Sequence, residues 1–125
     1  MITGFAAGVL LFSQAGLAMA SADQDRFTET SDVAFEEIAE GRAADALPSL
    51  EAQLESRPDD PALLINLAAA YIQIGRYDRA SESYRMAIES DERYDLELAD
   101  GNWIDSRLAA RHGLKTLEGQ MLAMR

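Results

Sequence analysis

Cysteine is absent from the 125-residue chain, and histidine occurs once, at His112. Disulfide bonds, thiolate nucleophiles and cysteine-ligated zinc sites are therefore excluded. The sequence also has no His-x-x-x-His pair, no glycine-rich phosphate loop and no Gly-x-Ser-x-Gly motif. The residue patterns that most often carry enzymatic chemistry are missing, so we expect neither a metal site nor a cofactor.

Basic residues are scarce, with 11 Lys and Arg against 22 Asp and Glu and a formal net charge of −11. Nucleic-acid binding requires clustered basic side chains, so nucleic acid is not an expected partner, and neither is an anionic lipid surface. One basic stripe, Arg107, Arg111 and Lys115, has the spacing of a helix face. We interpret it as a solvated face, with a docking stripe for an anionic partner as the alternative.

Residues 1–20 carry no charged side chain and end in Ala18-Met19-Ala20. A short apolar core before an A-x-A ending is typical of a secretory signal peptide, although no Lys or Arg precedes it. We therefore predict cleavage after Ala20, a periplasmic or secreted protein, and no stable membrane insertion afterwards. An uncleaved anchor and a cytoplasmic helix are the alternatives; the anchor is disfavoured because the stretch is short and is interrupted by Ser13 and Gln14.

Gly41 and Gly75 stand 34 residues apart, each between two stretches with helical patterning. This period is typical of a helix–turn–helix repeat, which buries its apolar face only by stacking on neighbours. In the second copy, Asp60 and Pro61 are suitable as the N-cap and first turn of a helix. Gly75 is suitable for its end, because glycine tolerates a positive φ.

The stretch 61–94 resembles the tetratricopeptide repeat family at nine positions. They are Leu64, Leu67, Ala68, Tyr71, Gly75, Tyr77, Ala80, Tyr84 and Ala87. The resemblance implies an all-α helical solenoid that binds other proteins. Residues 27–60 form a degenerate first copy, with Thr30 and Glu37 replacing a bulky residue and a tyrosine. Pro48 falls inside its second helix, which we expect to be kinked there, the alternative being a helix that begins late.

The chain after the second repeat has a different pattern. Apolar residues alternate with acidic ones from Tyr94 to Leu98, and the turn dipeptide Asp100-Gly101 follows, which predicts a small β-hairpin over 94–104. A helix over 105–122, with Gly113 lowering its propensity by up to about 1 kcal/mol relative to Ala, would then cap the solenoid. The predicted organisation is a leader at 1–20, a flexible acidic segment at 21–29 and a single domain at 30–122.

In the tetratricopeptide repeat family, the concave face is lined by the first helix of each repeat. The resemblance therefore implies that a protein or peptide partner contacts Phe35, Ile65, Asn66, Ala69, Ile72 and Gln73. No Lys or Arg lies among them, so capture of a terminal carboxylate is not expected. The alternative is that these apolar side chains are covered by the capping helix, by segment 21–30 or by a second copy of the chain.

We therefore predict an exported, non-catalytic scaffold or adaptor that binds a protein partner through the concave helical face. The main alternative is an accessory subunit of an enzyme complex, or a small enzyme with a site near His112 and Trp103. A purely self-assembling role is a further alternative. Export rests on the leader and partner binding on the repeat, so the two predictions are independent of each other.

Overall fold

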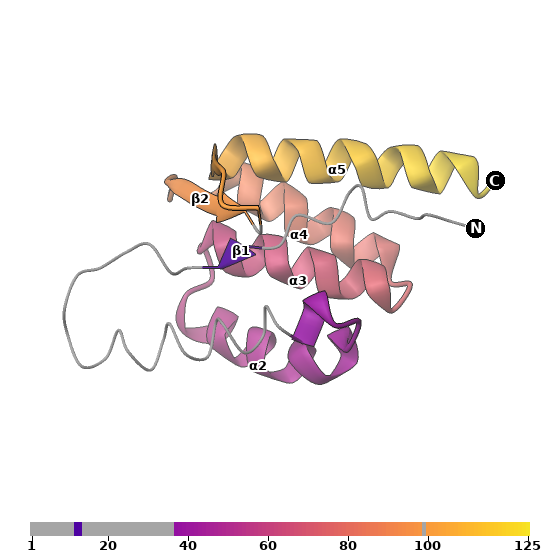
Figure 1. Cartoon of the computed structure of the whole chain (residues 1–125), viewed down its shortest axis with the longest axis horizontal. Coiled ribbons are helices and arrows are strands. Elements are labelled where there is room, and N and C mark those ends of the chain that lie inside the picture. The colour runs from indigo at the N-terminus through magenta and orange to yellow at the C-terminus, as the bar shows by residue number, and fades with distance from the viewer. Residues whose placement is uncertain (1–11, 14–36, 99) are drawn as a thin grey trace.

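The computed structural model describes residues 12–13, 37–98 and 100–125. Its helices are α2 (Ala43–Ser56), α3 (Pro61–Gln73), α4 (Tyr77–Glu89) and α5 (Ser106–Ala123), and residues 37–39 are also helical. The helices α2 to α5 lie side by side in chain order, each packed against the next (Figure 1). This arrangement confirms the predicted helical stack with its C-terminal helix. The leader 1–20, apart from Phe12 and Ser13, and the segments 21–29 and 30–36 lie outside the described residues.

Helix α2 forms around Pro48 rather than after it. It begins at Ala43 and buries Ala43, Ala46 and Leu50 on the side that packs against α3. Pro48 stands inside the helix, on its exposed side. The alternative of a helix that begins late is therefore wrong, because the apolar spacing across the proline holds the helix together through tertiary packing.

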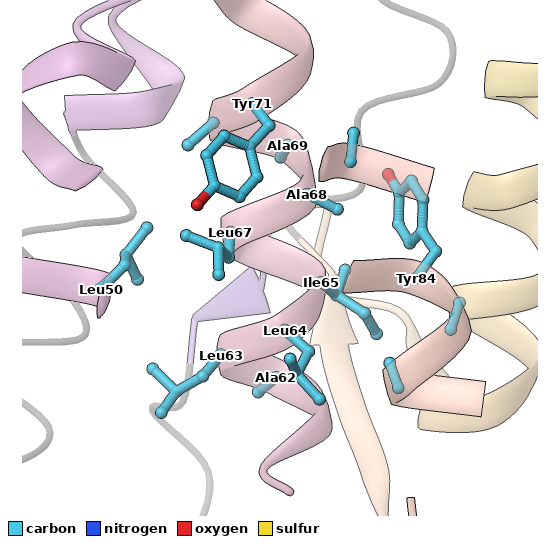
Figure 2. Packing of buried hydrophobic residues seen from close by; sticks show 14 of the residues in the cluster. Leu50, Ala62, Leu63, Leu64, Ile65, Leu67, Ala68, Ala69, Tyr71 and Tyr84 are labelled. Atoms are coloured by element: carbon cyan, nitrogen blue, oxygen red, sulfur yellow. The ribbon is translucent and has the colours of Figure 1, made fainter. Parts of the chain in front are cut away.

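Helix α3 is the centre of the stack, and every residue from Pro61 to Tyr71 is buried. A helix that is apolar on all sides needs neighbours on all sides, and α3 packs against α2, α4 and α5. Figure 2 shows Leu50 from α2 on one side of α3 and Tyr84 from α4 on the other. At its far end the chain turns at Gly75, whose φ of +79° favours glycine.

The start of α3 is capped by a buried carboxylate. Asp60 is 3% exposed, and its Oδ1 accepts hydrogen bonds from the backbone N–H groups of Ala62, at 3.0 Å, and Leu63, at 3.5 Å. The hydroxyl of Tyr94 donates to the same oxygen, and Arg57 Nη1 lies 2.7 Å from Oδ2. Burial, reinforced by the charge of Asp60, raises the pKa of Tyr94, while burial lowers the pKa of Arg57. The predicted N-cap is therefore confirmed.

Helices α4 and α5 pack against each other, and both bury small residues. Ala80 and Ala87 of α4 are 0% and 1% exposed, and Ala109 and Ala110 of α5 are both 0% exposed. At Gly113 the two helices are close, since a Cβ atom there would stand 2.5 Å from Cε1 and Cζ of Tyr84. The sequence suggested only that Gly113 weakens the helix; the structure shows that the ring of Tyr84 occupies the space of its missing side chain.

A three-stranded antiparallel sheet precedes α5. The predicted hairpin is confirmed as β2 (Asp95–Leu98) and β3 (Trp103–Asp105). Asp105 then caps α5, accepting from Leu108 N at 3.0 Å, and lies 2.6 Å from Arg93 Nε. These two interactions, the Arg93 bond first, lower the pKa of Asp105.

The third strand of this sheet was not expected. Strand β1 (Phe12–Ser13) pairs with β2 on the edge away from β3, with Phe12 opposite Leu98 and Ser13 opposite Glu97. It comes from within the predicted leader. A two-residue strand has no alternating pattern long enough to be recognised in a sequence, so its pairing is a tertiary observation.

Replacing Gly113 with Ala tests the contact between α4 and α5. We expect a loss of about 1–3 kcal/mol in the free energy of unfolding, because the new methyl group collides with the Tyr84 ring. Gly119→Ala is the matched control on the same helix, with nothing within 4 Å of the added Cβ. It should gain up to about 1 kcal/mol from helix propensity. Urea denaturation followed by circular dichroism measures the free energy of unfolding of both variants. An equal change in the two would contradict the close contact at Gly113.

The buried tyrosines predict loss of stability in alkali. Burial raises the pKa of Tyr84 from 10.0 to about 12, so the phenol stays protonated in the folded state while that of the unfolded chain ionises. The free energy of unfolding should therefore fall as the pH rises above about 10, by roughly 3 kcal/mol from Tyr84 alone. The Tyr84 hydroxyl has no hydrogen-bond partner among the described residues. Tyr84→Phe should thus be as stable as the wild type at neutral pH and lose less in alkali; parallel curves would contradict this.

Candidate protein-binding surface

Three of the residues predicted to contact a partner are buried. Ile65 and Ala69 are 0% exposed and Asn66 is 1% exposed, and Figure 2 places Ile65 and Ala69 within the packed core. Phe35 lies outside the described residues. The structure therefore favours the covered alternative for Ile65, Asn66 and Ala69, because a partner would reach them only after a covering element moved away.

The accessible part of the predicted surface lies at the C-terminal end of α3. Ile72 is half-buried and Gln73 is exposed. The amide of Gln73 donates from Nε2 to the carbonyl oxygen of Ile38 at 2.6 Å, which ties this end of α3 to the helical residues 37–39. Ile74, the next residue, is 37% exposed. Among the predicted contact residues that the structure describes, an accessible surface is found only here.

An open hollow adjoins this end of α3. It has a volume of about 440 Å³ and is bounded by the α3–α4 turn, the first turn of α4 and Met121 of α5. Met121 also lines a second hollow of about 280 Å³, so the two adjoin. We call the C-terminal end of α3 together with these two hollows the turn-end surface. Its residues are Ile72, Gln73, Ile74, Gly75, Arg76, Tyr77, Asp78, Arg79, Glu118, Met121, Leu122 and Arg125.

The turn-end surface combines apolar and charged side chains. Leu122 is 66% exposed, and the neighbouring Met124 is 57% exposed. Methionine side chains adapt to irregular partners because they are unbranched and polarizable. Three arginines and two acids accompany the apolar groups, so the area is mildly basic on an acidic chain. Open hollows of this kind suit a helix or extended segment with apolar anchors better than an enclosed small molecule.

A smaller hollow lies between α2, α3 and α4. Its volume is about 190 Å³, and repeat residues Leu64, Leu67 and Tyr71 line it together with the half-exposed Met86. The hydroxyl of Tyr71 in α3 donates a hydrogen bond to Oε1 of Glu51 in α2, at 3.0 Å. Burial, followed by the bond to Glu51, raises the pKa of Tyr71. These contacts join neighbouring repeats, so we assign the hollow to the packing of the solenoid.

The site considered for catalysis receives no support from the hollows described above. His112 on α5 is exposed, Trp103 on β3 is 54% exposed, and neither lines any of the three. Within the described part of the chain, no three His, Asp or Glu side chains lie close enough together to hold a metal ion. The helices described here are each too short or too polar to cross a membrane.

The predicted basic stripe is divided in the structure. Arg107 is half-buried, and its Nη2 donates to the carbonyl oxygen of Ser90 at 2.9 Å, which joins α5 to the end of α4. Arg111 and Lys115 are exposed. The interpretation as a solvated face therefore applies to those two residues, whereas Arg107 has a structural bond that helical spacing alone does not indicate.

Sequence reasoning missed most of the turn-end surface. Tyr77 is one of the nine positions that match the repeat pattern, and Met121 lies near the end of the predicted capping helix. One signal was present: Met121, Leu122 and Met124 exceed what a single helix face can bury in so short a segment. That residues of the α3–α4 turn share a hollow with Met121 could not be inferred from the sequence, because this depends on α5 running antiparallel to α4.

Comparison with known proteins supports the repeat assignment. A family model for the tetratricopeptide repeat matches residues 37–98, which is about half of the chain. No match was found to a curated protein or to a solved structure. The matched range contains the two glycine turns, the N-cap Asp60 and all nine repeat residues. Over residues 37–98, this chain belongs to the tetratricopeptide repeat family.

Proposed function

We propose that this protein is an exported scaffold that holds a protein partner on its turn-end surface and performs no chemistry of its own. Tetratricopeptide repeats suggest a protein-interaction scaffold. The observation that carries the proposal is the hollow at Met121, which adjoins the accessible end of the predicted concave face.

The binding energy should come from a few apolar anchors. Leu122, Met121 and Ile74 expose or border apolar area that a soluble domain seldom leaves uncovered without a partner. Interface energy concentrates in such central apolar groups, while charged groups at the rim govern orientation and association rate. Arg76, Arg79 and Arg125 fit the role of a rim that favours an acidic or neutral partner segment.

The turn-end surface can be tested with two leucines of the same helix. Leu122→Asp places a charge beside the hollow, whereas Leu108→Asp changes an equally accessible leucine, 56% exposed, about 21 Å away along α5. Both variants should fold, since both side chains are largely exposed. In affinity purification from the producing cell, Leu122→Asp should lose the partner by more than tenfold and Leu108→Asp should retain it.

The opposite result would move the interface elsewhere. If Leu108→Asp lost the partner and Leu122→Asp kept it, the outer face of α5 near the sheet would be the binding surface. If both kept it, neither leucine would be an anchor. Circular dichroism of each variant, at the same concentration, separates loss of binding from loss of structure.

Export is tested by the N-terminus of the protein in its cell. Cleavage after Ala20 predicts Ser21 as the first residue of the recovered chain, found outside the cytoplasm. A C-terminal affinity tag followed by N-terminal sequencing reads this directly. An intact Met1 on a cytoplasmic protein would remove export from the proposal and leave the turn-end surface unaffected.

A further inference from the structure

The edge of β2 that faces away from β3 has its own occupant. Strand β2 is paired on one side with β3, its hairpin partner, and on the other with Phe12 and Ser13. The backbone of Phe12 lies opposite Leu98, a half-buried residue that packs against the hydrophobic core. The occupied edge therefore belongs to the folded domain, whereas its occupant comes from a part of the chain more than eighty residues away.

We propose that this edge of β2 is a strand-docking site for an extended segment that is apolar opposite Leu98 and uncharged or basic opposite Glu97, and that the chain's own segment at Phe12 and Ser13 occupies it in cis. A partner that presents such a segment binds by replacing β1.

The backbone of β2 supplies the affinity for this occupant. An edge strand exposes unpaired N–H and C=O groups, which makes it a template for another strand. Strand β1 forms only two residue pairs with β2, Phe12 with Leu98 and Ser13 with Glu97. Such a short pairing contributes little by itself, so a longer segment from another chain can displace it. Main-chain bonds then provide affinity, and the position opposite Leu98 provides selectivity.

Charge determines which segments are accepted. Asp95 and Glu97 stand on β2, Asp100 in the turn and Asp105 at the end of β3, where Arg93 lies 2.6 Å from Asp105. Like charges directly opposite each other destabilise a strand pair. Residues 1–20 carry no charged side chain, so the cis occupant brings no repulsion to this acidic edge. An acidic segment is excluded from the site for the same reason.

Removal of the N-terminal segment would open the site. Cleavage after Ala20 would take Phe12 away with the leader and leave the edge of β2 free for a partner. This consequence rests on the proposed export, but the docking site itself does not. The sheet lies at the end of the helical stack opposite the α3–α4 turn (Figure 1), so it is separate from the turn-end surface.

A disulfide tests whether the N-terminal segment occupies the edge, because the natural chain has no cysteine. In the full-length chain, the pairs Phe12→Cys with Leu98→Cys and Ser13→Cys with Glu97→Cys join register partners. Adjacent register positions alternate between hydrogen-bonded and non-hydrogen-bonded residue pairs. A disulfide suits the non-hydrogen-bonded pair, in which the two side chains are closer. At least one pair should oxidise intramolecularly in air, as read by mass spectrometry. Phe12→Cys with Arg125→Cys is the control and should keep free thiols.

A peptide tests whether the edge binds a strand in trans. The probe is a synthetic peptide of residues 8–17 followed by two lysines, and its control has Asp in place of Phe at the position of Phe12. Fluorescence anisotropy should show that the reduced cysteine pair binds the probe at least tenfold more tightly than the oxidised pair. Full-length Phe12→Asp should bind it more tightly than the wild type, because its own segment then has a charged residue at the position opposite the half-buried Leu98.

Two results would overturn the inference. Free thiols in both register pairs, with the folded state shown by circular dichroism, would mean that the segment does not occupy the edge. Equal probe binding by oxidised and reduced chains, or by probe and control peptide, would mean that the edge is not a docking site. Leu122→Asp should bind the probe like the wild type, so failure of the turn-end surface and failure of this site are distinguishable.

Discussion

The buried carboxylate of Asp60 is the interaction on which the arrangement of this domain depends. It caps α3 and forms an ion pair with Arg57 from the preceding turn. It also accepts a hydrogen bond from the hydroxyl of Tyr94, in the segment that leads into the sheet. Three parts of the chain are therefore held at one point, at the start of the only described helix that is buried on nearly all sides. A buried charge is tolerated in a protein when its partners satisfy it, and here those partners position both the central helix and the hairpin.

The close spacing of the helices follows from small residues at defined positions. Ala68 of α3 and Ala80 of α4 are 0% exposed, and Gly113 of α5 accommodates the ring of Tyr84. Glycine lowers the intrinsic stability of a helix. At this position, however, it permits the ring of Tyr84 to be buried, and this burial stabilises the fold by more than the helix propensity lost. Propensity and packing therefore oppose each other at Gly113, and packing prevails because the interior tolerates no overlap of atoms.

The two proposed binding surfaces lie at opposite ends of the helices (Figure 1). The central helix is covered along its length, which removes Ile65, Asn66 and Ala69 from direct contact with a partner. The turn-end surface around Met121 at one end and the acidic sheet at the other both keep accessible residues. A short repeat protein that buries its middle can still present its ends, because turns and terminal strands leave side chains and backbone groups without helical neighbours.

The amino-acid sequence by itself determined the local elements: the helix start at Asp60 and Pro61, the turn at Gly75, the hairpin around Asp100-Gly101 and the last helix. Each depends on residues close together in the chain, through periodicity, capping or turn chemistry. The repeat assignment followed from the same short-range spacing. Only the tertiary structure decided that Ile65 is core, that Gly113 meets Tyr84, and that Phe12 pairs with Leu98. These depend on which elements cover which faces, a property of segments distant in sequence that no local pattern encodes.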